Sequence, residues 1–339
     1  MKILVTGLGG FLGGALGHRL LAEGARLRTL SRRPLPEWEQ LGVEVVRGPL
    51  EDRASVVEAC QGVDQVFHVA AKAGIWGSYA EYFDSNVEGT RNVVEGCWAG
   101  GVTQLVHTSS PSSVFDGQDC LGCDESKPYP EHFLNFYSES KAAAEQVVLQ
   151  ANGRRGLATV SLRPHLIWGP GDPHILPRVV KMADAGRLRR VGLGQNMVDL
   201  TYVDNAVDAH LCAMRNLTPE SPQAGKAYFI SNGSPVRLWE WVDQVLAGLG
   251  RPPVRGHLSL AKARLLGGIL EWLYRTLRLP GEPPMTRFVA CQMGTSHYYN
   301  ISASQRDFGY QPAVSLEVGM ERTLRYFNET LGPVTKTTI

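Results

Sequence analysis

The 339-residue sequence has few cysteines, almost no excess charge and no long apolar run. Its six cysteines are scattered, and so low a density without a paired framework fits a reducing cytoplasm. The 34 Lys and Arg residues nearly balance the 33 Asp and Glu residues, so no field of one sign would attract nucleic acid. No window offers about 18 consecutive strongly apolar residues, which argues against a transmembrane helix. We therefore expect a cytoplasmic protein without a nucleic-acid partner.

Low-complexity tracts and internal repeats are also missing, and 43% of the residues are hydrophobic, which excludes a disordered chain. Cys120 and Cys123 form a CxxC pair, but no second pair of ligands follows at a similar spacing. We therefore expect no metal and interpret these cysteines as small loop residues. A metal or redox role is the alternative.

The first sixteen residues admit two interpretations. Lys2 followed by an apolar stretch resembles the core of a signal peptide. However, five glycines fall between residues 7 and 14, and glycines weaken a membrane-inserting helix whereas a phosphate-binding turn requires them. We therefore expect this stretch to belong to the folded domain.

Short β-branched runs alternate with helical stretches through the first half of the chain, which is typical of parallel βαβ units. The expected strands are 2–6, 27–30, 43–47, 65–70, 104–109 and 158–163, and the expected helices are 11–23, 54–60, 87–98 and 137–151. This pattern predicts an α/β fold with a Rossmann-type, doubly wound parallel sheet. Ligands of such sheets bind at the carboxyl ends of the strands.

The second half is richer in proline and glycine and lacks a regular repeat. We expect residues 1–164 to form a dinucleotide-binding domain, to which 196–235 return through a strand at 228–230. Residues 165–195 and 236–330 are expected to form a smaller, mostly helical substrate-binding lobe. Residues 331–339 are expected to be a flexible tail.

A glycine-rich turn, Gly7-Leu8-Gly9-Gly10-Phe11-Leu12-Gly13, directly follows the first strand. Such glycines permit a tight turn and a close approach of the backbone to a pyrophosphate, and the helix N-terminus attracts the phosphate charge. This context predicts dinucleotide binding, whereas a plain tight turn is the alternative.

The end of the second expected strand bears on the choice of cofactor. An acidic residue there binds the ribose hydroxyls and repels a ribose phosphate, but this chain has Ser31-Arg32-Arg33. A hydroxyl and two guanidinium groups suit a 2′-phosphate, so we expect NADP to be preferred over NAD. If both arginines are only solvated surface charges, the chain would accept either cofactor.

A tyrosine and a lysine, Tyr137 and Lys141, lie four residues apart on an expected helix and therefore share one face. A nearby ammonium group favours the phenolate, which predicts a lowered pKa for Tyr137 and proton exchange with a substrate hydroxyl. Upstream, the strand at 104–109 ends in Thr108-Ser109-Ser110-Pro111-Ser112, which carries hydroxyl groups to the edge where the crevice is expected. Hydroxyl groups in this position can also simply cap a turn.

The glycine-rich turn, the serine-ended strand and the Tyr-Lys helix occur in the order seen in the extended short-chain dehydrogenase/reductase family, which residues 3–327 resemble. His68-Val69-Ala70-Ala71, Asn86-Val87-Glu88-Gly89-Thr90, Trp168-Gly169-Pro170-Gly171-Asp172 and Tyr202-Val203-Asp204-Asn205-Ala206 are similar to further family signatures. One departure is Pro49, since the family commonly has an acidic residue there that contacts adenine. That contact is lost or moves to Glu51 or Asp52.

The resemblance implies roles for particular residues and a homodimer. It gives the catalytic roles to Ser110, Tyr137 and Lys141. It implies that Ala70 and Ala71 border the adenosine half of the cofactor, and that the backbone after Pro164 meets the nicotinamide carboxamide. The complete set expected at the cofactor is Gly7, Gly10, Phe11, Leu12, Gly13, Ser31, Arg32, Leu50, Ala70, Ala71, Tyr137, Lys141, Pro164 and Leu166.

Within that family the chain resembles the 3β-hydroxysteroid dehydrogenase branch, especially sterol 4α-carboxylate 3-dehydrogenases that decarboxylate, at 113–119, 163–165 and 284–286. It is also similar to 2-alkyl-3-oxoalkanoate reductases of long-chain olefin synthesis at 71–74, 76–79 and 281–284. We expect oxidation of a 4α-carboxysterol at carbon 3 with loss of carbon dioxide, and the reductase activity is the alternative. A nucleotide-sugar epimerase or dehydratase and a non-catalytic cofactor sensor are less favoured, because Tyr137 and Lys141 are both present and Ile75 and Trp76 suit a lipid.

Both activities require a hydrophobic substrate that carries a carboxylate, and a buried carboxylate needs a cation or a hydrogen-bond donor. Lys72 and then His165 are the candidates, with Trp76 and Ser112 as further substrate contacts. Lys72 can equally be a surface lysine and His165 a packed core histidine.

The segment 258–279 has leucines and isoleucine at helical spacing among mostly basic residues. Such a helix either packs on the core or contacts a membrane surface beside a lipid-binding cleft. The sequence leaves both possibilities open.

Overall fold

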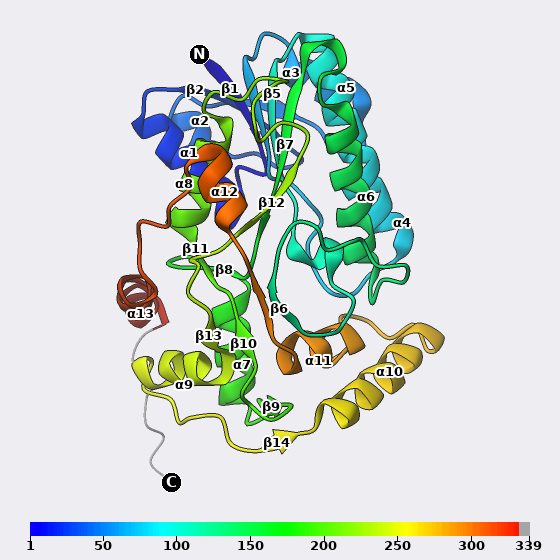
Figure 1. Ribbon diagram of the computed structural model, residues 1–339, viewed down its shortest axis with the longest axis vertical. Coiled ribbons are helices and arrows are strands. Elements are labelled where there is room, and N and C mark those ends of the chain that lie inside the picture. Colours follow the sequence, from blue (N-terminus) through cyan, green and yellow to red (C-terminus); the bar gives the residue numbers. More distant parts are fainter. Residues whose placement is uncertain (332–339) are drawn as a thin grey trace.

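The computed structural model describes residues 1–331 as a large α/β body with a smaller lobe at one end of its sheet (Figure 1). The expected fold class, a doubly wound parallel sheet of Rossmann type, is confirmed. Most of the tail expected at 331–339 lies outside the described residues, since only its first residue is placed, as the last of helix α13 (Leu316–Leu331). Among the described residues, no helix is long and apolar enough to cross a bilayer.

A seven-stranded parallel sheet forms the centre of the large body, in the order β12-β7-β5-β4-β1-β2-β3. Its strands are β1 (Lys2–Thr6), β2 (Arg26–Ser31), β3 (Glu44–Arg47), β4 (Gln65–His68), β5 (Gln104–Thr108), β7 (Ala158–Pro164) and β12 (Ala227–Ile230). The register pairs Thr6 with His68 and Thr108 with Leu162, so the carboxyl ends of the central strands lie at one edge. The chain order reverses between β1 and β4, and there a crevice forms at this edge.

Helices cover both faces of this sheet (Figure 1). One face carries α3 (Arg53–Cys60), α5 (Gly89–Gly100) and α6 (Phe136–Ala151), which pack side by side. The other face carries α1 (Phe11–Ala22) and α8 (Val203–Met214), with α2 (Pro36–Gln40) and α12 (Ser302–Phe308) nearby. The sheet is therefore buried on both sides, which explains its near-continuous apolar strands.

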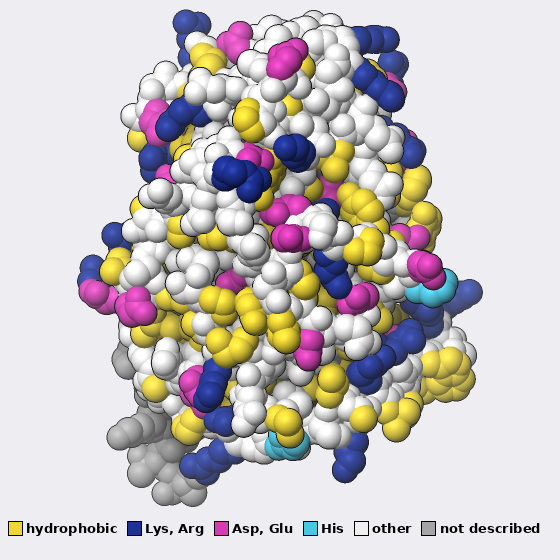
Figure 2. All heavy atoms as spheres, in the orientation of Figure 1, with side chains coloured by type: hydrophobic (Ala, Val, Ile, Leu, Met, Phe, Trp, Pro, Cys, Tyr) yellow, Lys and Arg dark blue, Asp and Glu magenta, His cyan; other side chains and the backbone are white. Residues whose placement is uncertain are grey.

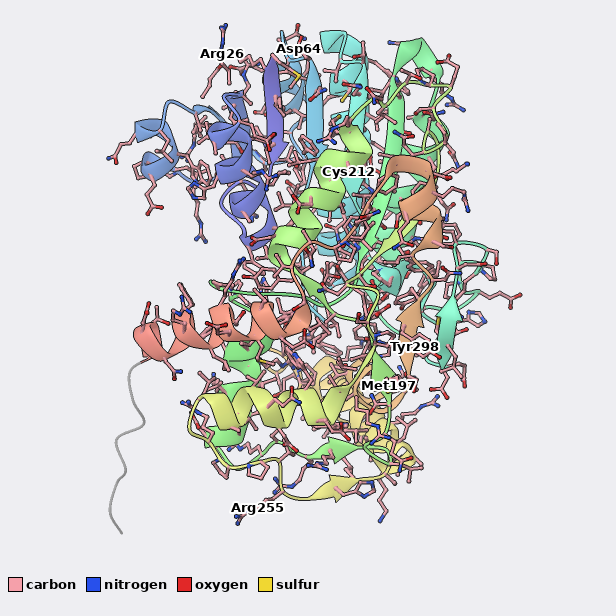
Figure 3. The ribbon with its side chains drawn as sticks, turned by 60° about the vertical axis from the view of Figure 1, so that its left-hand side comes forward. Arg26, Asp64, Met197, Cys212, Arg255 and Tyr298 are labelled. Carbon is pink, nitrogen blue, oxygen red and sulfur yellow. A yellow bond between two sulfur atoms is a disulfide. The ribbon has the colours of Figure 1, made fainter. Side chains whose placement is uncertain are left out.

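The lobe combines short strands with helices. A small sheet has the order β13-β10-β15-β6, and Met197 of β10 and Tyr298 of β15 lie in its neighbouring strands (Figure 3). Its strands are β6 (Cys120–Cys123), β10 (Met197–Val198), β13 (Val236–Arg237) and β15 (His297–Tyr299). The helices of the lobe are α7 (Ile175–Asp184), α9 (Leu238–Gly248), α10 (Leu260–Thr276) and α11 (Arg287–Gly294). Two further pairs of short parallel strands are β8 (Ile167–Trp168) with β11 (Thr201–Tyr202), and β9 (Arg190–Val191) with β14 (His257–Leu258).

The helix expected at 87–98 begins earlier and contains an irregular turn. A short helix, α4 (Tyr79–Tyr82), leads into a π-helical turn over Phe83–Glu88, and α5 follows without a break. A π-helical turn accommodates an extra residue and is often found near functional sites. Here it places Asn86 beneath the loop at residues 71–78, where Asn86 bonds both backbone groups of Lys72.

The expectation that Cys120 and Cys123 are loop residues is wrong. Both belong to strand β6, and the two form a disulfide across a Cα–Cα distance of 5.6 Å. The register against β15 shifts at this point, and Gly122 has a φ of +69°, so the two cysteines come to the same side of the strand. Residues 1–331 contain no cluster of three or more His, Cys, Asp or Glu side chains placed to hold a metal ion.

Candidate active site

The glycine-rich turn joins β1 to α1 and approaches the end of β4 very closely. Gly7 has a φ of +78°, and a Cβ atom there would lie 2.8 Å from the backbone nitrogen of Ala70. A Cβ atom on Gly13 would lie 2.1 Å from the carbonyl oxygen of Gly7. Because neither position can hold a side chain, the N-terminus of α1 stays open toward the crevice, as a bound pyrophosphate requires.

A cleft of about 900 Å³ runs along the carboxyl edge of the sheet from this turn to helix α6. All fourteen residues expected at the cofactor line this cleft, and Ser110 and Lys72 line it as well. The cleft therefore joins the glycine-rich turn, the ends of β2 and β4, and the Tyr-Lys helix into one continuous surface. The residues that line it fit an extended dinucleotide, and the nicotinamide end of such a ligand would lie near Tyr137.

The ribose end of the cleft is formed by the end of β2. Ser31 and Arg32 line it, whereas the Ser31 hydroxyl donates a hydrogen bond of 2.8 Å to the carbonyl of Arg33. Glu51 and Asp52 were the two residues expected to replace the adenine contact that is missing at Pro49, and the structure places them differently. Glu51 lines the cleft, whereas the carboxylate of Asp52 caps α3 by accepting from the backbone nitrogens of Ala54 and Ser55.

Arg32→Ala should raise the KM for NADP by about 10- to 100-fold and leave the KM for NAD nearly unchanged. A charge-assisted hydrogen bond contributes about 1.5–3 kcal/mol, and only NADP carries the phosphate that Arg32 would bind. The matched control is Arg33→Ala, because Arg33 is exposed but does not line the cleft. Equal losses for the two cofactors would contradict this role for Arg32.

Ser110 and Tyr137 meet at the floor of the cleft. The Ser110 oxygen accepts hydrogen bonds from the backbone nitrogen of Ser112, at 3.2 Å, and from the Ser112 hydroxyl, at 2.9 Å. The Ser110 hydroxyl also lies close enough to the Tyr137 phenol to lower its pKa. Ser112 is buried and does not line the cleft, so it orients Ser110 and does not contact a ligand there.

Lys141 is 97% buried and is held by the strand end beside it. Its ammonium donates a 2.7 Å hydrogen bond to the carbonyl of Thr108, and Nζ lies 3.4 Å from Nε2 of His107. Burial lowers the pKa of Lys141 to about 8, against the attraction of Glu145 one turn further along α6. The ammonium is therefore charged at neutral pH and becomes neutral as the pH rises through about 8.

The structure contradicts the lowered pKa that the Tyr-Lys spacing predicts for Tyr137. Burial raises the pKa of the phenol, and the neighbouring Ser110 hydroxyl opposes that rise. The Lys141 ammonium points to Thr108 and His107, so desolvation dominates at the phenol. Tyr137 is thus a protonated acid at neutral pH.

The sequence did not indicate the contact of His107 with Lys141. His107 belongs to β5, and its Nδ1 lies 3.0 Å from the Ser161 hydroxyl while its ring centre lies 5.5 Å from that of His68. Burial and the Lys141 charge lower the pKa of His107 well below its usual value, so the ring is neutral and Nε2 can face the ammonium. The one available signal was a polar residue within an otherwise apolar, buried strand.

Lys72 is the only one of the two proposed carboxylate partners that reaches the cleft. Its Nζ lies 3.9 Å from a carboxylate oxygen of Glu81 and 5.5 Å from the centre of the Tyr82 ring. The side chain is partly exposed, and its backbone is held by the Asn86 side chain, which also bonds the Ser140 hydroxyl of α6. Asn86 thus links the backbone at Lys72 to helix α6, which carries Tyr137 and Lys141.

The other two substrate candidates lie away from the cleft. His165 is buried, and its Nε2 lies 2.7 Å from Nδ1 of His297, so it is a packed histidine. Trp76 borders a smaller cavity formed by the 71–78 loop, residues 134–136 and α10. There the Trp76 ring packs edge-on against Tyr274.

Several cleft residues were not anticipated. They come from α4, the π-helical turn and the start of α7, and comprise Glu81, Asp84, Ser85, His174 and Ile175. A Cβ atom on Gly74 would lie 3.5 Å from the carboxylate of Glu282, so the loop at 71–78 meets the loop at 281–284. These two segments are 200 residues apart in the chain, and no local pattern predicts that they meet.

Comparison with known proteins gives consistent results over nearly the whole chain. The sequence profile of the 3-beta hydroxysteroid dehydrogenase/isomerase family matches residues 4–260. A 2-alkyl-3-oxoalkanoate reductase of Stenotrophomonas maltophilia is 50% identical over 325 residues, which cover 95% of this chain and 98% of that protein. A decarboxylating sterol-4-alpha-carboxylate 3-dehydrogenase of Homo sapiens is 33% identical over 330 residues, which cover 96% of this chain and 88% of that protein.

Solved structures agree on the fold. The crystal structure of gox2253 superposes on this chain with a TM-score of 0.77 at 25% sequence identity. The superposition covers 97% of this chain and 98% of the gox2253 chain.

Proposed function

This chain belongs to the 3-beta hydroxysteroid dehydrogenase/isomerase family, and from that membership we propose that it reduces the 3-keto group of a hydrophobic 2-alkyl-3-oxoalkanoate. It is an NAD(P)-dependent oxidoreductase. The proposal reverses the order of the two activities expected from the sequence, in which oxidation of a 4α-carboxysterol came first. The reason is the 50% identity to a 2-alkyl-3-oxoalkanoate reductase along almost the full length of both chains, against 33% to the sterol enzyme.

The structural observation that supports this proposal is the meeting of two segments beside the cleft. The sequence resembles the reductases at residues 71–74, 76–79 and 281–284, and Gly74 and Glu282 bring these segments together. Lys72 projects from the first segment into the cleft that contains Tyr137. We propose that Lys72 binds the carboxylate of the substrate while the alkyl chains extend from the cleft along residues 71–78 toward Trp76.

The reacting groups act in a simple order. A bound nicotinamide cofactor supplies the hydride. As the ketone carbon is reduced, the Tyr137 phenol donates its proton to the ketone oxygen, and the Ser110 hydroxyl donates a hydrogen bond to the same oxygen. The Lys141 ammonium stabilises the resulting phenolate by its positive charge. The cofactor half of the cleft would hold the nicotinamide ring close to the ketone carbon.

The reduction rate should fall as the pH rises through about 8, because Lys141 loses its charge there. Below that pH both the Tyr137 phenol and the Lys141 ammonium are protonated, which is the form the reduction needs. The measurement is kcat against pH between 6 and 10 with saturating substrate and cofactor. Lys141→Arg, which stays charged throughout this range, should retain some activity and lose the high-pH decline.

The decisive experiment offers both candidate substrates to the purified protein. A 2-alkyl-3-oxoalkanoate with NADPH should be reduced, and a 4α-carboxysterol with NADP⁺ should release little carbon dioxide. Lys72→Ala should weaken turnover of the carboxylated substrate far more than that of the corresponding neutral ketone. Release of carbon dioxide from the sterol alone would restore the sterol activity, because the β-keto acid formed by its oxidation decarboxylates readily.

A nucleotide-sugar epimerase or dehydratase activity is tested in the same assay by offering a UDP-sugar.

The homodimer and the cytoplasmic location stay predictions. Light scattering of the purified protein tests the first, and fractionation of cells tests the second.

A further inference from the structure

Helix α10 leaves one long side uncovered. Its buried positions, Ala263, Gly267 and Glu271, face α11, and the fit is so close that a Cβ atom on Gly267 would lie 2.6 Å from the backbone of Thr286. Leu265, Ile269 and Trp272 recur at intervals of four and three residues, about half a turn away from that buried stripe. They therefore form a second stripe that points away from the protein.

This outer stripe is unusually apolar for an exposed surface. The side chains of Leu265 and Trp272 are 67% and 63% exposed. Thirteen large hydrophobic side chains are strongly exposed among the described residues, and six of them fall between 265 and 279. Of the two possibilities that the sequence left open for this segment, packing of its whole apolar face on the core is therefore excluded.

The charges around the stripe are of one sign. Lys262, Arg264 and Arg278 are exposed, and Glu271 is the only acidic residue between 258 and 279. Glu271 is buried, and its two oxygens bond Nε and the backbone nitrogen of Arg287. In the space-filling view, hydrophobic and basic side chains lie together over the position of α10 (Figure 2).

We propose that α10 and the adjoining residues 277–279 form a docking surface, the α10 face, that rests on an anionic lipid surface. Aliphatic side chains with a tryptophan bury into the acyl boundary, and flanking cations bind anionic headgroups. A second copy of this chain fits less well, because a two-fold contact through this face would place the same cations against one another. An acidic partner protein would match the charge but leaves the concentration of leucines unexplained.

The inner side of α10 connects this face to the active site. The Arg275 guanidinium lies between the rings of Trp76 and Phe136, 5.5 and 5.4 Å from their centres, and Phe136 directly precedes Tyr137. Trp76, Phe136 and Arg275 all line the smaller cavity, which therefore lies between the inner side of α10 and the start of helix α6. The α10 face thus lies on the side of the lobe nearest to Tyr137, where a substrate with long alkyl chains would arrive from a lipid surface; this extends the proposed function but does not depend on it.

The test is flotation of the full-length protein with vesicles of phosphatidylcholine, with and without 30% phosphatidylglycerol. The wild-type protein should float with the anionic vesicles, and the bound fraction should fall several-fold at 0.5 M salt. Leu265→Glu/Ile269→Glu should lower the bound fraction at least tenfold. The matched control, Leu121→Glu/Val318→Glu, adds the same charge at exposed apolar positions outside α10 and should float as the wild type does.

Reduction of a short, water-soluble 3-oxoacid should be equal in all three proteins, which shows that the variants are folded. Absence of flotation for the wild type, or equal flotation of the two double variants, would overturn the proposal. It would also be overturned if the wild type were a dimer and the α10 double variant a monomer by light scattering, since a second copy would then cover the face. None of these outcomes depends on which oxoacid is the natural substrate.

Discussion

Tyr137→Phe should lower kcat for ketone reduction by about 10³-fold with little change in KM. Removal of one oxygen takes away the acid that protonates the ketone oxygen, and general acid catalysis contributes about 10²- to 10⁴-fold. The aromatic ring remains and keeps its packing against Tyr82, whose centre lies 6.1 Å away. The substrate should therefore still bind, and the loss should appear in single-turnover rates measured with saturating cofactor.

Tyr82→Phe is the matched control for this substitution. The Tyr82 hydroxyl donates to the backbone carbonyl of Trp76 at 3.2 Å and does not line the cleft. Its removal should change kcat by less than about fivefold, because a single neutral hydrogen bond contributes about 0.5–1.5 kcal/mol. A Tyr137→Phe protein with near-normal kcat would mean that another group protonates the substrate.

Glu145→Ala should destabilise the protein by about 3–5 kcal/mol, one of the largest effects available to a single substitution. Glu145 is fully buried, and its two oxygens bond Nε and one terminal nitrogen of Arg163 at 2.9 and 2.6 Å. The Tyr129 hydroxyl donates to the same carboxylate at 2.7 Å. Loss of the Glu145 carboxylate would leave the buried guanidinium of Arg163 without a counter-charge. The free energy of unfolding, obtained from urea denaturation, measures the destabilisation.

Two further variants separate this effect from a general weakening of helix α6. Gln150→Ala changes an exposed residue of the same helix and should shift the free energy of unfolding by less than about 0.5 kcal/mol. Glu145→Ala/Arg163→Met should recover part of the loss, because it removes both charges together. If the double variant were no more stable than Glu145→Ala, the cost would come from packing and not from the uncompensated charge.

Local patterns predicted the large body of the fold well, since parallel strands buried on both faces have apolar runs that are easy to recognise. The ends of these strands were placed to within one or two residues, and the extra turn before α5 was missed because a π-helical turn has no sequence signature. The lobe was harder. Its strands are two to four residues long and pair with distant segments, as β6 does with β15.

The same division applies to the site. The cofactor half of the cleft is built from consecutive strand ends, so one motif after another locates its residues. The orientation of Lys141 toward Thr108 and His107 depends on packing in three dimensions, and spacing along a helix gave the wrong sign for the pKa of Tyr137. The meeting of Trp76 with Arg275 joins residues far apart in the chain and had no signal at all.

Strand β12 has a consequence for synthesis of the protein. It is the outermost strand of the large sheet beside β7, yet it is reached only after the chain has passed through α7 and four short strands of the lobe. While residues 165–226 are being made, the backbone of β7 has one unpaired edge, and an open strand edge can pair with another chain. Fragments that stop before residue 227 should therefore aggregate, and the nascent chain should need protection until about 230 residues have left the ribosome.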